Sequence, residues 1–335
     1  MCLYPRRIIN RKYTATEKNG GCIPTMPIIG TDENGWEIYD ERVAEVNVPC
    51  GQCIECRQAK ARNWMIRLHE ELRSCNYPYF ITLTFSPQKL GELRKELNLN
   101  ECNALAGKAV RRSLERWRKD HKKSLRHWYI TELGHEGTER IHLHGLIFSE
   151  IPLEFTKSKQ EHYYHWKYWK YGLVYVGDYC NKRTINYIVK YVTKIDTDHK
   201  GFIGQVLCSP GMGREYVQRP GVEAAHKYRP KNTIDYYRLN NGQKVKLPTY
   251  YKNKFVNEDQ RELIWREFMD RDQTAVMGIV HDNRRITPEI LGNIVNKAQE
   301  RSRFYGYGDD SQEWKKKPWN VTERMLKSEI NAKNS

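Results

Sequence analysis

The stretch that decides the fold is Arg140-Ile-His-Leu-His-Gly-Leu-Ile-Phe148, in which apolar and polar side chains alternate. Alternation with a period of two is typical of a β-strand, because successive side chains point to opposite faces of a sheet. Ile141, Leu143 and Ile147 then form a row that faces the core. The imidazoles of His142 and His144 project side by side from the other face, which need not be buried in hydrocarbon.

The residues before this strand predict its partner. Trp128-Tyr-Ile-Thr-Glu-Leu133 also has the composition of a strand, and Gly134 to Gly137 read as a turn, so the two strands form a hairpin. A hairpin centred near Gly137 places Glu132 across from His142. Two imidazoles and a carboxylate leave open coordination positions, as a catalytic divalent ion requires. The alternative is a pair of polar histidines on a half-solvated strand.

Further elements follow on both sides of the hairpin. The patterns predict strands at 79–85 and 172–176 and helices at 54–73, 103–119 and 182–194. This order predicts an α+β fold, with one antiparallel sheet of about five strands flanked by helices, of split βαβ type. We assign residues 53–215 to this core, residues 1–52 to a loop-rich N-terminal arm, and residues 216–335 to a basic C-terminal extension. The extension includes a predicted hairpin at Asn241-Gly242 and a helix at 258–271.

The predicted helix 182–194 carries a second set of polar residues. At about 100° per residue, Tyr187, Lys190, Tyr191 and Lys194 share one face, and apolar residues fill the other. A phenol is a weak nucleophile while protonated, so neighbouring ammonium groups and a metal ion would favour its attack on a phosphate. The alternative is a solvated amphipathic helix whose tyrosines cover the edge of the core.

The composition favours a polyanionic partner. The 335 residues include 57 Lys and Arg against 41 Asp and Glu, a formal charge of +16, which favours nucleic acid but fits an anionic membrane surface as well. No apolar stretch approaches the roughly 20 residues of a membrane helix, and the N-terminus lacks the apolar core of a signal peptide. We therefore expect a soluble, cytoplasmic protein that does not act at a membrane.

Three of the nine cysteines lie close together in the sequence, at Cys50, Cys53 and Cys56. This spacing suits reduced thiols or a structural zinc ion better than a disulfide ladder, with Cys22 or Cys2 as a fourth ligand. The alternative is a turn followed by the start of a helix.

Two segments are candidates for DNA binding. Residues 163–171 interleave aromatic and basic side chains, so that Trp166 and Trp169 could stack on bases of a single strand, or instead belong to the core of a strand edge. Arg111, Arg112 and Arg116 could follow phosphates, although a solvated helix face is the commoner meaning of such runs. The lysine run 315–317 is predicted to be disordered.

Taken together, three segments resemble the motifs of HUH endonucleases in order and spacing. They are Phe80-Ile-Thr-Leu-Thr84, His142-Leu-His144 and Tyr187-Ile-Val-Lys190-Tyr191-Val-Thr-Lys194. The resemblance is closest to replication initiation proteins of gokushovirus-like microviruses, which are single-stranded-DNA bacteriophages. Pro49-Cys-Gly-Gln-Cys-Ile-Glu-Cys56 and Pro210-Gly-Met-Gly213 also look like segments of those proteins.

This resemblance implies the HUH nuclease fold and a magnesium or manganese ion. The implied ligands are His142, His144 and Glu132, with His135 in the adjoining turn as a competitor for the third position. The implied setting is the cytoplasm of a bacterial host.

The resemblance also implies a metal-dependent endonuclease and strand transferase. Tyr187 or Tyr191 would attack single-stranded DNA at the origin of the replicative form, leaving a 5′-phosphotyrosine link and a free 3′-hydroxyl for the host polymerase. The second tyrosine would rejoin the strand, and Lys190 and Lys194 would support the phosphate or the leaving group. No Gly-x-x-x-x-Gly-Lys-Ser/Thr segment occurs in the sequence, so a host helicase is the implied partner.

Two other functions agree with parts of this pattern. A noncatalytic single-stranded nucleic-acid-binding protein would explain the charge and the aromatic residues, but not two tyrosines beside a histidine pair. A relaxase or transposase would use the same HUH chemistry. Replacing both tyrosines by phenylalanine separates the binding protein from the enzymes.

Overall fold

The computed structural model describes residues 1–135, 137–311 and 318–327. Contacts group the chain into two compact units. The N-terminal unit comprises residues 1–57, 228–233 and 256–314, and the sheet unit comprises residues 58–227, 234–255 and 315–335. The loop-rich arm therefore shares a unit with residues 256–314, which the sequence pattern assigns to the C-terminal extension. The lysine run 315–317 lies outside the described residues.

One seven-stranded sheet forms the centre of the sheet unit, with strand order β11-β6-β7-β5-β10-β9-β8. Every neighbouring pair is antiparallel. The predicted antiparallel sheet flanked by helices is confirmed, with more strands than expected. The strands are β5 (Tyr77–Leu83), β6 (Arg126–Leu133), β7 (Ile141–Ser149), β8 (Thr156–Lys157), β9 (Tyr163–Trp166), β10 (Trp169–Val176) and β11 (Val206–Cys208).

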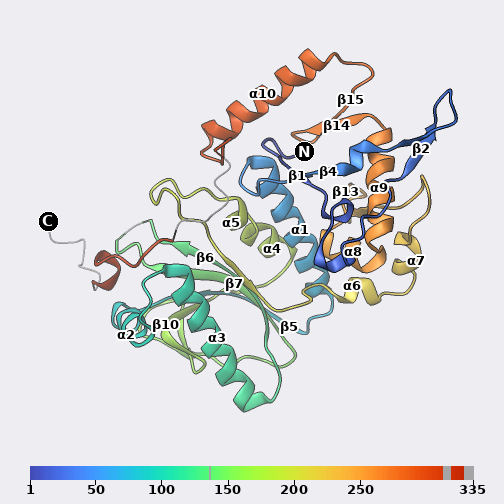
Figure 1. Cartoon of the computed structure of the whole chain (residues 1–335). Coiled ribbons are helices and arrows are strands. Elements are labelled where there is room, and N and C mark those ends of the chain that lie inside the picture. Colours follow the sequence, from blue (N-terminus) through green and yellow to red (C-terminus); the bar gives the residue numbers. More distant parts are fainter. Residues whose placement is uncertain (136, 312–317, 328–335) are drawn as a thin grey trace. The chain divides into compact units, whose positions relative to one another are not determined.

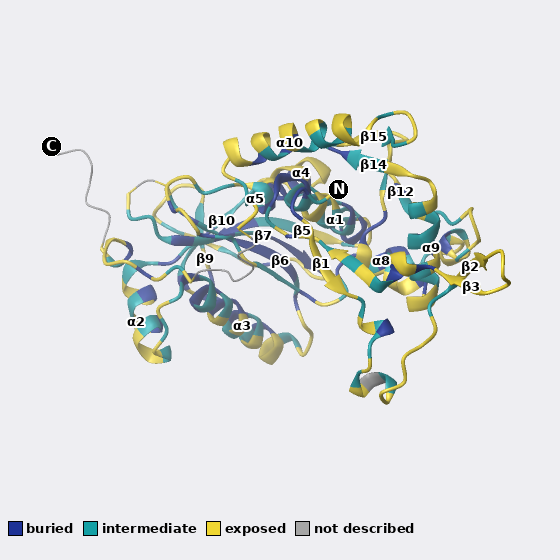
Figure 2. Ribbon diagram, turned by 45° about the horizontal axis from the view of Figure 1, so that its top comes forward, coloured by how far each residue is buried: buried dark blue, intermediate teal, exposed yellow. Residues whose placement is uncertain are grey.

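Helices cover both faces of this sheet. Ile141, Leu143 and Ile147 of β7 pack with α2 (Pro87–Leu97) and α3 (Cys102–His121) in one hydrophobic cluster. Leu146 and Phe148, on the opposite face, pack with α1 (Ile54–Arg73) and α4 (Lys182–Ile188) in another cluster. Figures 1 and 2 show the two layers, with the central strands buried between them. The face that carries the histidines is therefore covered along only part of its length.

The predicted helix 182–194 is two helices in the structure. The first, α4, ends at Ile188, and α5 (Lys190–Thr193) follows after Val189, whose N–H bonds to the carbonyls of both Ile185 and Tyr187. β-Branched residues lower helix propensity because they lose χ1 freedom in a helix, and they are frequent at this junction. The break turns the chain between the two tyrosines.

The other elements of the sheet unit are short. The predicted hairpin at Asn241-Gly242 is confirmed, and helix α1 has the predicted bounds. The remaining elements are α6 (Glu215–Gln218), α7 (Val222–His226), β12 (Tyr236–Arg238), β13 (Lys244–Lys246), α8 (Thr249–Phe255) and a 3-10 helix at Arg324–Leu326.

The N-terminal unit combines small two-stranded ladders with two long helices. The predicted helix 258–271 is confirmed as α9 (Glu258–Asp270). The ladders pair β1 (Arg6–Ile9) with β4 (Glu45–Val48), β2 (Ile28–Thr31) with β3 (Glu37–Tyr39), and β14 (Gln273–Val276) with β15 (Ile279–Asp282). The other elements are α10 (Pro288–Phe304) and 3-10 helices at Arg11–Tyr13, Glu17–Asn19 and Glu41–Ala44.

A buried carboxylate joins the arm to α9 within the N-terminal unit. Asp40 is 1% exposed and accepts hydrogen bonds from Arg42 at 2.7 and 3.0 Å and from Arg266 Nε at 2.9 Å. The Arg42 hydrogen bonds, with those of Arg266, outweigh burial and lower the pKa of Asp40. Asp40 is therefore ionised and paired at neutral pH.

Across the described part of the chain, every helix is too short or too polar to pass through a bilayer.

Replacing Gly145 by alanine should destabilise the sheet. A Cβ atom there would lie 1.9 Å from Cδ1 of Tyr129 and 2.7 Å from the carbonyl oxygen of Trp128. We expect Gly145→Ala to lower the free energy of unfolding by about 2 kcal/mol, as overpacked cores do. Thermal unfolding measures the change. Gly107→Ala in α3 is the control, because its Cβ would meet only Leu207 at 3.9 Å; equal stability of the two variants would contradict the crowding.

Replacing Asp40 by asparagine should destabilise the N-terminal unit by about 2 kcal/mol at neutral pH, because hydrogen bonds to charged groups contribute ~1.5–3 kcal/mol. A carboxyl with a lowered pKa stabilises the fold above its unfolded pKa of about 3.9, and this contribution is lost as pH falls through the folded value. The difference between wild type and variant should therefore shrink in acid.

Thermal unfolding between neutral and acidic pH tests this expectation. The exposed carboxyl of Glu33, in the same unit, provides the control Glu33→Gln. A pH-independent difference for Asp40→Asn would contradict the assignment.

Candidate active site

The two antiparallel ladders of β7 bring a threonine, a carboxylate and two histidines together. Glu132 lies opposite His142 in the β6–β7 register, as predicted, and Thr82 lies opposite His144 in the β5–β7 register. Glu132 Oε2 is 2.8 Å from His144 Nε2, and Thr82 Oγ1 is 3.0 Å from His144 Nδ1. Both nitrogens of His144 are thus oriented by neighbouring strands. Thr82 belongs to the first resembling motif, but sequence reasoning did not assign it a role.

The electrostatics keep Glu132 charged and His142 neutral. Burial by itself would raise the pKa of Glu132, but hydrogen bonds from His144 and Lys194 outweigh it and lower the pKa to about 2. Burial and the neighbouring His144 lower the pKa of His142 to about 4. A neutral imidazole keeps a lone pair available for a metal ion.

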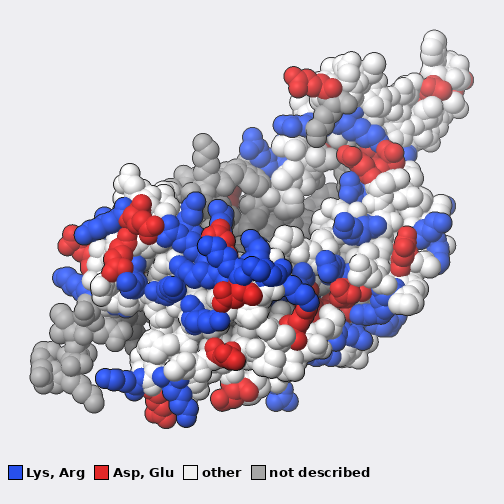
Figure 3. All heavy atoms as spheres, turned by 90° about the horizontal axis from the view of Figure 1, so that it is seen from below, with Lys and Arg blue, Asp and Glu red and all other residues white. Residues whose placement is uncertain are grey.

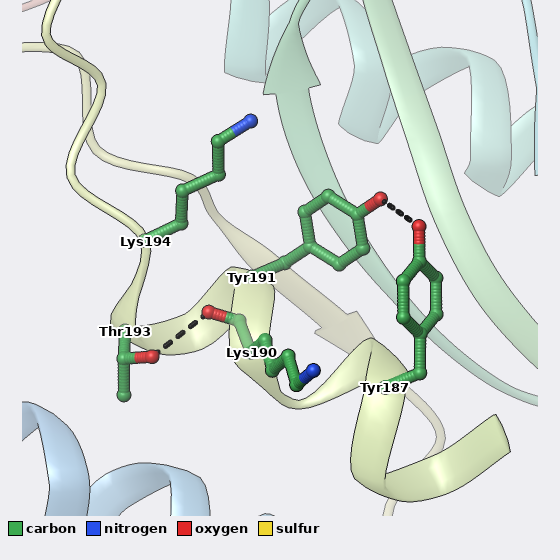
Figure 4. A pocket seen from close by; sticks show the side chains of 5 residues that line it. All are labelled: Tyr187, Lys190, Tyr191, Thr193 and Lys194. Atoms are coloured by element: carbon green, nitrogen blue, oxygen red, sulfur yellow. Dashed lines mark hydrogen bonds between the residues drawn. The ribbon is translucent and has the colours of Figure 1, made fainter. Parts of the chain in front are cut away.

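Tyr187 and Tyr191 converge above this group. Their hydroxyl oxygens are 2.9 Å apart, and their rings meet edge to face, as Figure 4 shows. The Tyr191 ring also stacks on His144 with centroids 4.5 Å apart. Tyr187 is 48% exposed, whereas burial, the hydrogen bond to Tyr187 and the charge of Glu132 raise the pKa of Tyr191. The two phenols thus differ in environment while sharing one hydrogen bond.

The cap of α4 holds the first tyrosine in place. The Asn181 side chain accepts hydrogen bonds from the backbone N–H groups of Arg183 and Thr184 and so begins the helix. Ile185 and Ile188 anchor the opposite side of α4 in the core. The hydroxyl of Tyr187 is therefore directed by a capped and buried helix.

The two lysines of this segment take different positions. Lys194 caps the end of α5, where the chain leaves the helix, and its amine contacts Glu132 Oε1 and lies 2.9 Å from His135 Nε2. The amine of Lys190 lies away from the two hydroxyls in Figure 4. The face predicted to be shared by all four residues is interrupted by the break at Val189, so Lys194 is the lysine that joins the candidate site.

His135 makes its own contacts. Its Nδ1 lies 2.7 Å from Asp198 Oδ2, and its Nε2 faces Lys194. Asp196 bonds to His199 at 2.8 Å, and this histidine is buried. Both ring nitrogens of His135 are thus engaged in a neighbouring cluster, which leaves Glu132 as the carboxylate beside the histidine pair.

The donor set fits a divalent cation by its chemistry. Nitrogen from two imidazoles and oxygen from a carboxylate suit magnesium or manganese chemistry with open positions. His144 and Glu132 already have ligand atoms 2.8 Å apart, while the His142 ring is parallel to that of His144 at 6.3 Å. The three residues do not close around one point, since the two groups of described residues with all ligand atoms within 4.8 Å are other ones. These two groups are Cys2, Cys50, Cys53 and Cys56, and His135, Asp196 and His199.

A hollow of about 910 Å³ opens beside the histidines and tyrosines. Neighbouring rings in it form a continuous series, with centroids 6.0 Å apart for Tyr163–Tyr175, 6.3 Å for Tyr175–Phe80 and 6.1 Å for Phe80–Tyr187. The series leads to Tyr191 and His144. Its aromatic lining residues are Phe80, Tyr163, Tyr175, Tyr179, Tyr187 and Tyr191.

The two predicted base-stacking tryptophans are in the core. Trp166 and Trp169 are 3% and 2% exposed and pack with the cluster under α3, so neither presents a ring face to DNA. Tyr163 precedes Trp166 by an odd number of positions and therefore points to the other face, where it lines the hollow. The prediction for Trp166 and Trp169 is wrong, because alternation separates the rings of this stretch between the two faces.

The predicted arginines lie on α3, across the sheet from the tyrosines. Arg111 is exposed, Arg112 is paired with Glu96, and Arg116 donates to the carbonyl of Tyr168 and the hydroxyl of Tyr171. Figure 3, seen from the side on which α3 lies in Figure 1, shows Lys and Arg side chains gathered in a band. Arg112 and Arg116 have structural partners, and any phosphate they bind would lie far from the hydroxyl pair.

Comparison with known proteins bears on the segment that holds the site. Residues 78–196 match the model of the ORF2 family of replication-associated proteins. The match begins in β5 and ends beyond α5, so it contains Thr82, Glu132, both histidines and both tyrosines. The resemblance of the motifs to phage replication proteins is thereby confirmed.

Two relatives extend the match beyond this segment. The chain is 23% identical over 279 residues to "Replication-associated protein ORF2" of Spiroplasma virus 4, covering 78% of this chain and 82% of that protein. It is 23% identical over 244 residues to "Replication-associated protein VP4" of Bdellovibrio phage phiMH2K, covering 68% and 73%. No solved structure gives a significant match.

Proposed function

We propose that this chain is a replication initiator that nicks single-stranded DNA at a phage origin through a tyrosine nucleophile and later rejoins the strand. The observation that carries the proposal is the pair of tyrosine hydroxyls 2.9 Å apart, with Tyr191 stacked on a histidine bound to Glu132. This geometry lies within the segment that matches replication-associated proteins. The names of the two relatives support a role in replication.

The proposed reaction is a transesterification. The phenol oxygen of Tyr187 or Tyr191 forms a bond to phosphorus and loses its proton, the bond from phosphorus to O3′ breaks, and O3′ takes up a proton. The products are a 5′-phosphotyrosine and a free 3′-hydroxyl, which the host polymerase extends while a host helicase separates the strands. Lys194 stands beside Glu132, where its ammonium can meet the phosphate or the leaving oxygen.

His142, His144 and Glu132 would hold a magnesium or manganese ion. Such an ion supplies charge that polarises the phosphoryl oxygen. Thr82 and Glu132 orient the His144 ring from two neighbouring strands, because each contacts a different nitrogen. The proposed ligands are therefore carried by strands of the sheet rather than by loops.

Two tyrosines allow the strand to be cut and closed by one protein. While one phenol is esterified to the 5′ end, the other is a single hydrogen bond away and can attack the next origin copy. The reverse reaction of the 3′-hydroxyl on the phosphotyrosine then seals the circle. A relaxase or transposase would share the first step of this chemistry.

The aromatic series in the hollow would hold the strand. Bases stack on tyrosine and phenylalanine faces without regard to sequence, and the series ends at the nucleophiles. The same series supports the second candidate, a noncatalytic protein that binds single strands. The two candidates differ in whether a covalent product forms.

The first experiment is cleavage of circular single-stranded DNA from the replicon that encodes this chain. Purified protein, manganese and DNA are resolved on a denaturing gel, with and without protease. We expect a protein-linked 5′ end in wild type, a reduced yield in Tyr187→Phe and in Tyr191→Phe, and none in the double variant, because phenylalanine lacks the attacking oxygen.

Two controls complete this experiment. Tyr77→Phe changes an exposed tyrosine of β5 outside the hollow and should cleave as wild type does. A chelator should abolish cleavage but leave binding largely intact; equal cleavage with chelator would overturn the metal assignment. Tight binding with no covalent product, across metals and origin-containing substrates, would favour the noncatalytic protein.

Removing a ring from the series should weaken the binding of single-stranded DNA. We expect Tyr175→Ala to raise the dissociation constant by about tenfold, because stacking of one base contributes roughly 1–3 kcal/mol. Tyr175→Phe keeps the ring and should bind as wild type does. Fluorescence anisotropy of a labelled oligonucleotide at fixed ionic strength measures the change. Equal affinities of Tyr175→Ala and the control Tyr77→Ala would remove the hollow from the binding path.

A further inference from the structure

Four cysteines meet in the N-terminal unit, far from the histidines and tyrosines in the sequence. The sulfur atoms of Cys2, Cys50, Cys53 and Cys56 all lie within 4.8 Å of one another. Cys50 Sγ and Cys56 Sγ are 3.9 Å apart. Four sulfurs bound to one zinc ion at about 2.3 Å would lie about 3.8 Å from each other. The spacing therefore matches a tetrahedral four-thiolate site.

Backbone amides point at these sulfurs. The N–H of Leu3 donates to Cys53 Sγ at 3.5 Å, that of Cys50 to Cys2 Sγ at 3.2 Å, and that of Cys53 to Cys50 Sγ at 3.3 Å. Amide donors around a sulfur stabilise the thiolate form, which is the form that binds a metal. Three of the four sulfurs thus have donors that favour negative charge.

The start of a long helix adds to this effect. Cys53 immediately precedes α1, and Cys56 lies in its first turn. The N-terminus of a helix carries partial positive charge and favours thiolates. Four thiolates this close together repel one another unless a cation lies between them. Helix, amides and sulfurs therefore all point to a cation at the centre of the group.

We propose that Cys2, Cys50, Cys53 and Cys56 bind one structural zinc ion. All nine cysteines are free, and a sulfur separation of 3.9 Å is well beyond the roughly 2.05 Å of a disulfide. Soft thiolate ligands in tetrahedral arrangement select zinc among the common cellular ions, with iron as the competitor. Cys22, the other candidate for the fourth ligand, is exposed and outside the group.

The zinc ion would join segments that the chain alone leaves apart. Cys53 is fully buried and Cys50 is nearly so, in a small hydrophobic cluster with Leu3, Val276 and Ala298. These residues come from the N-terminus, from β14 and from α10. A bound ion would fix the N-terminal segment to the start of α1 and support a cluster too small to be stable by burial alone.

Metal analysis of the purified full chain tests this proposal. Protein prepared without chelator under reducing conditions should contain about one zinc per chain, measured by plasma mass spectrometry. Cys2→Ser and Cys56→Ser should each lower the zinc content at least about tenfold, since losing even an outer partner of a metal site costs ~10–100-fold in affinity. Cys22→Ser is the matched control and should keep the wild-type content.

A conservative variant separates ligand loss from misfolding. Cys56→His retains a zinc ligand of another type, so it should recover zinc where Cys56→Ser does not. Exchange of zinc for cobalt should give the visible absorption of tetrahedral thiolate-bound cobalt in wild type and in Cys22→Ser. Wild-type protein that neither contains nor takes up zinc would overturn the proposal, as would stoichiometric iron in place of zinc or full zinc content in Cys2→Ser.

Discussion

The pairing of β7 with its two neighbours determines which side chains meet at the candidate active site. β7 brings His142 and His144, β6 brings Glu132 and β5 brings Thr82, and each contact depends on the register of two ladders. A shift by one residue would turn both histidines toward α3 and into the hydrocarbon layer. Gly145 belongs to the same constraint, because the ring of Tyr129 occupies the space where a Cβ would be.

The central part of this arrangement could be predicted from the sequence, because it rests on short-range rules. Strand alternation separates Ile141 and Leu143 from the histidines, and the length of one turn places Glu132 opposite His142. The role of Thr82 requires knowing that β5 pairs with β7, a contact between residues distant in the chain. Cys2 joins Cys50 for the same kind of reason, since no spacing rule links positions so far apart.

Other predictions fail for local physical reasons. Trp166 and Trp169 do not form one surface with Tyr163, because alternation in β9 and the following hairpin sends the tryptophans into the core. Residues 182–194 do not form one continuous helix, because their β-branched side chains favour an interruption. That interruption carries Lys194 out of the helix and toward Glu132. A pattern that is correct in composition can thus fail in direction.

The hydrogen bond between Tyr187 and Tyr191 has a consequence for the order of events. Two hydroxyls 2.9 Å apart share one hydrogen, and either oxygen can be the donor. An oxygen that becomes esterified to phosphate has lost its hydrogen and can only accept. The remaining hydroxyl then has a single direction in which to donate, so the protein carries a chemical record of which tyrosine holds the DNA.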